Sequence, residues 1–173
     1  MSIDDYLASG NKKDRQHYKR VLREAEKSGI KIDRHSCAEN IDEALPLIRN
    51  VEQEHGALPN PWARQMLEQM QMVSSSFLTA RIDNQLVGCG LIFQDNDAQM
   101  TSMLGLAKDV PYVYFMLVYE SLKMAMERKV RFLRWGSGAY DVKQRLGFSL
   151  EDNGSLVFAA VNPYLQKAIQ WLS

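Results

Sequence analysis

Residues 76–106, SFLTARIDNQLVGCGLIFQDNDAQMTSMLGL, carry the strongest structural signal in the sequence. Three apolar runs alternate there with two short polar turns. The runs are 76–82, 85–94 and 99–106. Asp83-Asn84 is typical of a two-residue hairpin turn, and Asp95-Asn96-Asp97 gives the second turn. Three strands joined by turns this short predict an antiparallel meander.

Helical and strand patterns flank this meander on both sides. The predicted helices are 12–28, 41–54, 62–72, 112–128, 139–146 and 164–172, and the further predicted strands are 30–35, 130–135 and 155–161. Asn40 and Glu43 form a capping-box pattern at the start of the second helix. The strand 130–135 follows a long crossover helix, which predicts a parallel pair near Leu104 and Phe132. The fold class is α/β (α+β), a mixed twisted sheet flanked by helices.

Length, charge and cysteine content limit the class of protein. A chain of 173 residues fits one domain, 1–173. Lys plus Arg and Asp plus Glu number 21 each, so bulk charge does not favour nucleic acid or membrane. Two cysteines without metal-ligand spacing indicate reduced thiols, no metal site and a cytoplasmic location. The start is acidic without an apolar leader core, and no apolar run is long enough to span a bilayer.

Near the C-terminus, residues 136–148 read GSGAYDVKQRLGF. This segment resembles the G-x-x-x-Y-x-x-K-x-x-x-G-F signature of Fem-like and related GNAT-fold proteins. Asp5-Tyr6-Leu7-Ala8-Ser9 and Asp109-Val110-Pro111-Tyr112 are similar to segments of the same group. The order of predicted elements also resembles that of the GNAT superfamily. The resemblance implies a GNAT-fold acyltransferase of the branch related to the Fem peptidoglycan aminoacyltransferases.

The resemblance implies an N-acyltransferase that uses an acyl-CoA cosubstrate and a small-molecule or peptide amine acceptor. A first alternative is an aminoacyl-tRNA-dependent, Fem-like transferase that forms an amide bond. A second is a non-catalytic GNAT-like module that binds a ligand or partner. Typical acetyl-CoA users carry Q/R-x-x-G-x-G/A before the long helix, whereas 107–112 here has no glycine pair. The missing glycine pair favours aminoacyl-tRNA as the donor. The small size of the chain and its balanced charge favour acyl-CoA as the donor.

The predicted helix 12–28 is the one clearly basic element. It carries Lys12, Lys13, Arg15, Lys19, Arg20, Arg23 and Lys27 against Asp14, Glu24 and Glu26. In most proteins, a charged helix of this kind simply has one face exposed to solvent. The alternative is a surface that holds the phosphates of coenzyme A or of a tRNA acceptor stem through charge.

Two residues of the C-terminal motif are candidate catalytic groups. The resemblance implies that Lys143 contacts the donor or acceptor, where its charge would stabilise an oxyanion. Tyr140 would protonate the leaving group, since a phenol with a pKa of about 10 keeps its proton at neutral pH. The competing interpretations are a solvated lysine and a core aromatic residue. Because Tyr140 and Lys143 lie three residues apart on a helix, we expect both in one cleft.

Further candidates lie at helix ends and in loops. Glu54 and His55 end the second helix, where either is a candidate general base and His55 has the more useful pKa. A histidine there also suits the helix dipole, which is the competing interpretation. The donor-binding candidates are Lys108, Val110, Tyr112, Gly136 and Ser137. The first three precede a helix N-terminus, which favours phosphate although Asp109 opposes it.

Cysteine and methionine residues have a structural interpretation first. Cys89, between Gly88 and Gly90, is expected to be a small buried residue rather than a nucleophile. The two glycines suggest a bulge or close packing. The Met-rich patches around Met70 and Met103 are expected in the core, with a pocket for an apolar acyl chain as the alternative.

Overall fold

The computed structural model describes residues 3–9, 11–136 and 140–149. The helices are α1 (Ile3–Ser9), α2 (Lys12–Lys27), α3 (Ile41–Glu54), α4 (Ala63–Glu68), the 3-10 turn η1 (Met70–Met72), α5 (Val113–Arg128) and α6 (Tyr140–Arg145). The strands are β1 (Lys31–His35), β2 (Ser75–Ile82), β3 (Gln85–Gln94), β4 (Ala98–Leu106) and β5 (Phe132–Trp135). The predicted order of elements is confirmed from α2 to α6, whereas α1 was not predicted. The predicted strand 155–161 and helix 164–172 lie outside the described residues.

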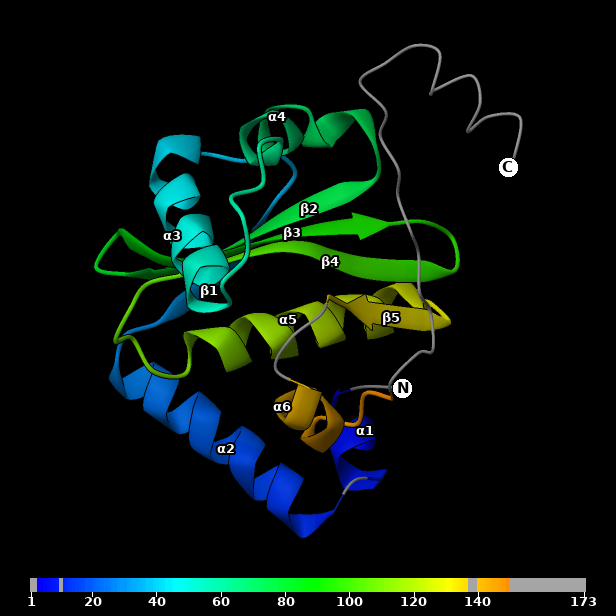
Figure 1. Ribbon diagram of the computed structural model, residues 1–173. Helices are drawn as coiled ribbons and strands as arrows, with labels where there is room; N and C mark the ends of the chain where they lie inside the picture. The colour runs from blue at the N-terminus through cyan, green and yellow to red at the C-terminus, as the bar shows by residue number, and fades with distance from the viewer. Residues whose placement is uncertain (1–2, 10, 137–139, 150–173) are drawn as a thin grey trace.

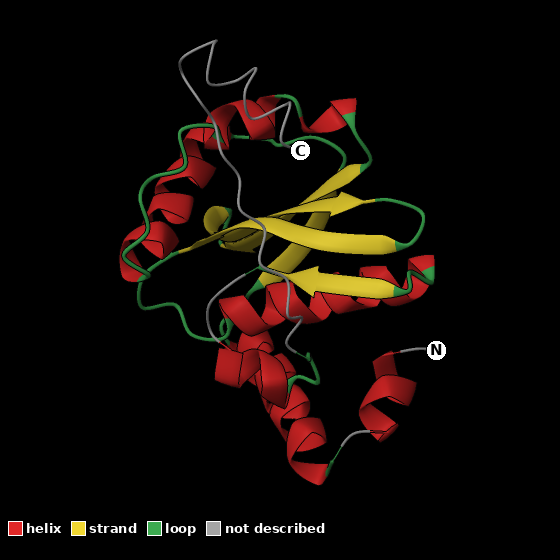
Figure 2. Cartoon of the chain, turned by 45° about the vertical axis from the view of Figure 1, so that its right-hand side comes forward, coloured by secondary structure: helices red, strands yellow, loops and turns green. Residues whose placement is uncertain are grey.

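The strands form one mixed sheet in the order β1-β2-β3-β4-β5. The pairs β1–β2, β2–β3 and β3–β4 are antiparallel, and β4–β5 is parallel, so the predicted meander and mixed sheet are confirmed. Helices α3 and α4 cover one face and α5 covers the other (Figure 1). Helices α1 and α2 pack mainly on α5, as a further layer, and Ala25 near the end of α2 joins the cluster between α5 and the sheet (Figure 2).

The turn between β2 and β3 shows why the meander was predictable. Asp83 and Asn84 have φ values of 47° and 67°, the left-handed pair that a two-residue hairpin needs. Short polar side chains tolerate this conformation better than other non-glycine residues. The second turn is held by Asp95, whose Oδ1 accepts from the backbone N–H of Asp97 at 2.7 Å and of Ala98 at 2.6 Å. These two bonds lower the pKa of Asp95.

Two glycines allow helices to approach the sheet on opposite faces. A Cβ on Gly88 would collide with the Val113 side chain at the start of α5. A Cβ on Gly105 would lie 2.9 Å from the backbone nitrogen of Ile48 in α3 and 2.7 Å from Cys89 Sγ. The expectation of close packing is therefore confirmed for Gly88. It is wrong for Gly90, where a Cβ would meet ordinary van der Waals contacts of 3.7 Å or more.

Two local predictions need correction. Asn40 precedes α3 in the left-handed region (φ 52°, ψ 54°) and makes no side-chain capping bond. Capping requires extended backbone, and here the Asn40 carbonyl accepts from Glu43 N–H at 2.9 Å instead. The predicted helix 62–72 is split into α4 and η1. The split buries Met70 and leaves Met72 79% exposed, so the Met-rich patch is only partly core.

We predict that Gly105→Ala lowers the free energy of unfolding by about 1–3 kcal/mol, the usual cost of overpacking. The new methyl group would press on the backbone nitrogen of Ile48, which cannot move without shifting α3. Gly90→Ala is the matched control, since its methyl group would have normal contacts. Urea denaturation of both variants measures the difference. Equal stability of the two variants would contradict the packing that we describe.

Candidate functional site

The parallel ladder between β4 and β5 is short, because β5 ends at Trp135 while β4 continues to Leu106. Their paired residues run from Ala98 with Phe132 to Thr101 with Trp135, four pairs in all. Residues 102–106 of β4 continue without β5, and Leu104 lies opposite Gly90 of β3. The predicted parallel pair is confirmed, but its placement at Leu104 is wrong. On the other side of β4, its pairing with β3 has a register shift between Leu91 and Ile92, the mark of a β-bulge.

Two buried hydroxyl groups lie around Trp135, where the strands part. Thr101 is the strand partner of Trp135 and is 6% exposed. Tyr114, in the first turn of α5, packs edge-on to the Trp135 ring at 6.4 Å between centroids. Within the described part of the chain, neither Thr101 Oγ1 nor Tyr114 Oη has a hydrogen-bond partner. Buried polar atoms are nearly always paired, so these atoms are candidates to bind polar groups of a ligand.

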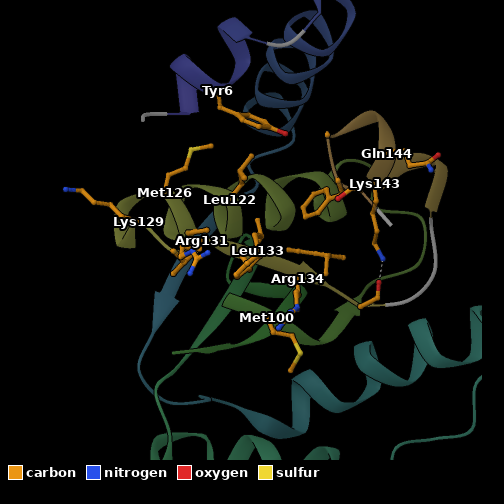
Figure 3. Close-up of a pocket in the computed structure, with 18 of the residues that line it drawn as sticks. Tyr6, Met100, Leu122, Met126, Lys129, Arg131, Leu133, Arg134, Lys143 and Gln144 are labelled. Carbon is orange, nitrogen blue, oxygen red and sulfur yellow. Dashed lines mark hydrogen bonds between the residues drawn. The ribbon is translucent and has the colours of Figure 1, made fainter. Parts of the chain in front are cut away.

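A cavity of about 790 Å³ borders β5 and connects it with α6. It is lined by β5, the C-terminal half of α5, α6 and Tyr6 of α1 (Figure 3). Three predicted site residues, Gly136, Tyr140 and Lys143, meet at its wall. The expectation that Tyr140 and Lys143 share a cleft is confirmed. Ser137 lies outside the described residues.

Lys143 is not a solvated lysine. Its side chain is inside the fold, and the residue is only 8% exposed. Nζ donates to the carbonyl oxygen of Gly136, the bond drawn as a dashed line in Figure 3. Nζ also lies 5.9 Å from the centroid of the Tyr140 ring, and Tyr140 is half exposed. Burial lowers the pKa of Lys143. The ammonium group therefore joins α6 to the end of β5 and supplies a positive charge at the cavity wall.

Tyr6 is a cavity residue to which the sequence alone assigned no role. Its hydroxyl donates to the carbonyl of Leu146 at 2.5 Å and so attaches α1 to the end of α6. Gly147 follows with φ +87°, and a Cβ there would collide with the Tyr6 hydroxyl. A sequence signal was present, since Tyr6 and Gly147 both belong to segments, 5–9 and 136–148, that resemble Fem-like GNAT proteins. Their contact spans almost the whole chain and could not be read from either segment.

Glu54 and His55 lie away from this cavity. They end α3, on the face of the sheet opposite α5, and both are exposed. One turn earlier, the side chain of Asn50 donates to the carbonyl of Leu106 at 3.1 Å. The end of α3 is therefore held beside the end of β4. The two candidate bases are at the C-terminal end of the parting strand, not beside Lys143, and their role stays a prediction.

The loop between β4 and α5 takes glycine-like conformations without glycine. Asp109 and Tyr112 have φ values of 64° and 69°. Val110 packs under α5 and Tyr112 packs against α2, while Lys108 is exposed. No side chain caps the first turn of α5. This loop thus provides an uncapped helix N-terminus beside Lys108, an arrangement that suits an anion.

Nucleophilic and metal chemistry find no support among the described residues. Cys89 is fully buried, and burial raises its pKa to about 12, so the thiol stays protonated at neutral pH. Residues 3–9, 11–136 and 140–149 contain no cluster of His, Cys, Asp and Glu able to hold a metal ion. In the same residues, every helix is too short or too polar to cross a membrane.

The sequence profile of the acetyltransferase (GNAT) domain matches residues 12–144. The chain therefore belongs to this family and is a GNAT-type acyltransferase. Members of the family in general use acyl-CoA as cosubstrate. A comparison with curated proteins found no match.

Solved structures agree on the fold. A ribosomal-protein-alanine N-acetyltransferase from Brucella melitensis biovar Abortus 2308 is 17% identical over 76% of this chain and 99% of its own, with a TM-score of 0.55. A GNAT-family acetyltransferase from Streptococcus pneumoniae TIGR4 is 15% identical over 77% of this chain and 99% of its own (TM-score 0.56). An aminoglycoside acetyltransferase from an uncultured soil sample, in complex with sisomicin, is 13% identical over 79% of this chain and 99% of its own (TM-score 0.56).

We predict that iodoacetamide at about pH 8 modifies Cys37 but not Cys89 in the native protein. A thiol whose pKa is about 12 has almost no thiolate at that pH, and Cys89 is also inaccessible. Cys37 is only half-buried. Mass spectrometry should find one modified thiol before unfolding in denaturant and two afterwards. Modification of Cys89 at the rate of Cys37 in native protein would contradict its position in the core.

Proposed function

We propose that this chain is an N-acyltransferase that moves an acyl group from an acyl-CoA-type thioester to an amine. The observation that carries the proposal is that β5 ends at Trp135, opposite Thr101, while β4 continues to Leu106. A thioester arm with amide groups can lie along the exposed edge of β4, as a peptide adds to a strand. The buried hydroxyls of Thr101 and Tyr114 would then gain partners.

The reaction needs an attacking amine, stabilisation of charge on the carbonyl oxygen and a proton for the leaving sulfur. The amine nitrogen attacks the thioester carbon, the C–S bond breaks, and the amine proton passes to a base. In this proposal the charge of Lys143 favours the oxyanion, and Tyr140 protonates the thiolate. Both line one cavity, with Nζ and the phenol ring 5.9 Å apart. Glu54 or His55 accepts the amine proton from the other side of β4.

The donor's phosphates are assigned to the loop between β4 and α5. Its uncapped helix N-terminus and the exposed Lys108 favour an anion, with Val110 and Tyr112 shaping the loop. Gly136 and Ser137 are assigned to the acyl end of the donor. We assign the whole range 1–173 to one such domain. A cytoplasmic location is supported by two free cysteines, because free thiols persist in reducing compartments.

A second candidate is aminoacyl transfer from tRNA, as in the Fem-like branch. The basic helix α2 and the glycine-free loop favour it, because RNA is held through many phosphate contacts. The acceptor in either case is an amine on a small molecule or peptide. The sisomicin complex of the soil acetyltransferase shows that one relative of the same fold binds an amine-rich small molecule.

We predict that acyl-CoA binds the protein in titration calorimetry and that binding changes little between about 50 and 200 mM salt. Charged tRNA should bind weakly and lose affinity steeply over that range, because its binding would depend on counterion release. Free coenzyme A, which carries no acyl group, and deacylated tRNA are the controls. Tight tRNA binding without affinity for any coenzyme A derivative would support the Fem-like reaction instead. Binding of acyl-CoA without turnover across a panel of amines would support a non-catalytic module.

We predict that Lys143→Met lowers turnover roughly a hundredfold, the usual cost of one lost oxyanion donor. Because Nζ donates to Gly136, the variant should also lose up to about 1–3 kcal/mol of stability. Gln144→Met is the matched control, since Gln144 lines the same cavity from the same helix and is exposed. Turnover and thermal midpoint are measured on each sample. Normal turnover with reduced stability would show that Lys143 only positions α6.

A further inference from the structure

The cavity beside β5 extends well past the residues assigned to catalysis. Lys143 lies at one end of the cavity, and Lys129, at the end of α5, lies at the other (Figure 3). Between them the walls come from β5 and the C-terminal half of α5. The cavity volume is about 790 Å³, most of which a group as small as acetyl would leave empty. The cavity therefore has room for a larger part of a ligand.

The walls between these two ends are mainly apolar. Leu122, Ala125 and Met126 recur at helical spacing on α5, so their side chains share one face of the helix. Leu133 and Trp135 are alternate residues of β5, both partly buried, so they lie on one side of the strand. Helix and strand thus face the cavity with two apolar surfaces, as Figure 3 shows for Leu122, Met126 and Leu133.

The charges on the lining argue against an amine in this cavity. The described lining contains no carboxylate, and its cations are Lys129, Arg131, Arg134 and Lys143. Like charges repel, so an acceptor amine that is protonated at neutral pH would bind poorly there. The long side chains of lysine and arginine can instead lay their apolar stems along an uncharged ligand and keep their charges in water. The lining thus suits an apolar part of the donor better than the acceptor.

The cavity begins where the thioester is placed in the proposed function. Gly136 follows β5 and lines the cavity, and a Cβ on it would lie 3.8 Å from the carbonyl oxygen of Thr101. The parallel ladder ends at Thr101, and the hydroxyl of Thr101 has no partner within the described part of the chain. On the cavity side, Lys143 Nζ donates to the carbonyl of Gly136. A thioester held between Thr101 and Lys143 can therefore direct its acyl group past the end of β5 into the cavity.

We propose that this cavity binds a linear apolar acyl chain of the donor, so that the transferred group is longer than acetyl. The inference rests on the proposed function, in which Lys143 and Tyr140 mark the reacting carbonyl. From Leu122 to Lys129, α5 extends about 10 Å at the helical rise per residue. An extended octanoyl chain matches this length, given C–C bonds of about 1.5 Å. Each methylene group that leaves water there should strengthen binding about fourfold.

The first test compares acetyl-CoA with octanoyl-CoA by titration calorimetry on the full chain. Octanoyl-CoA should bind at least about tenfold more tightly, because its additional methylene groups leave water in the cavity. Glutaryl-CoA, whose chain ends in a carboxylate, is the anionic comparison. Equal affinity for acetyl-CoA and octanoyl-CoA would overturn the proposal, and so would a higher affinity for glutaryl-CoA than for octanoyl-CoA.

Cavity-filling variants show whether the preference arises in this cavity. Met126→Trp adds volume from α5 and should abolish the preference for octanoyl-CoA, with the affinity for acetyl-CoA unchanged. Met72→Trp is the matched control, the same substitution at a methionine that is exposed and outside the lining. Ala125→Leu, which fills the cavity from the same face of α5, is a second variant if Met126→Trp lowers the thermal midpoint. A preference for octanoyl-CoA that persists in a folded cavity variant would overturn the site.

Turnover separates this site from the proposed function. Across a panel of amines, octanoyl-CoA should have a lower KM than acetyl-CoA at similar kcat, because chain contacts are the same in the ground state and the transition state. Turnover of acetyl-CoA without any gain for longer chains would overturn the chain site and leave acyl transfer intact. Tight binding of octanoyl-CoA that Met126→Trp abolishes, without turnover of any thioester, would support the site and contradict the function.

Discussion

The short parallel ladder between β4 and β5 is the constraint on which the other parts of the molecule depend. Parallel neighbours cannot be joined by a tight turn, so α5 has to cross back over the sheet between them. The outer side of α5 then carries α1 and α2, and the end of β5 carries α6. The ladder ends at Thr101, whose buried hydroxyl has no partner among the described residues, and our proposal places the donor there. The short parallel ladder thus determines both the arrangement of the helices and the position of the candidate site.

The sequence predicted those parts of the fold that neighbouring residues specify. Asp83-Asn84 defines a hairpin by its own conformational preference, so the meander could be predicted. No turn connects β4 with β5, so their register depends on how α5 packs, and Leu104 was predicted opposite Phe132, where Ala98 is found. Asn40 shows a similar limit, because its preference for capping gave way to a left-handed backbone. Tertiary packing overrides local preference in both cases.

The candidate site was predictable only along one helix. Helical spacing brought Tyr140 and Lys143 to one cavity, as expected. The burial of Lys143 and its bond to Gly136 depend on how a short helix sits against a strand, which spacing does not contain. Tyr6 was missed because its contact with Leu146 joins residues 140 positions apart. Positive φ at Tyr112 likewise occurs at a residue type that would not suggest it.

The contact between Tyr6 and Leu146 makes the first helix part of the candidate site. Helix α6 has six residues, far fewer than an isolated helix needs to be stable in water. It is held from outside, by Lys143 at the end of β5 and by Tyr6 on α1. A protein shortened by its first nine residues would keep the whole sheet and lose one of these two supports. The first helix, close to one end of the chain, is here a structural element of the cavity beside β5.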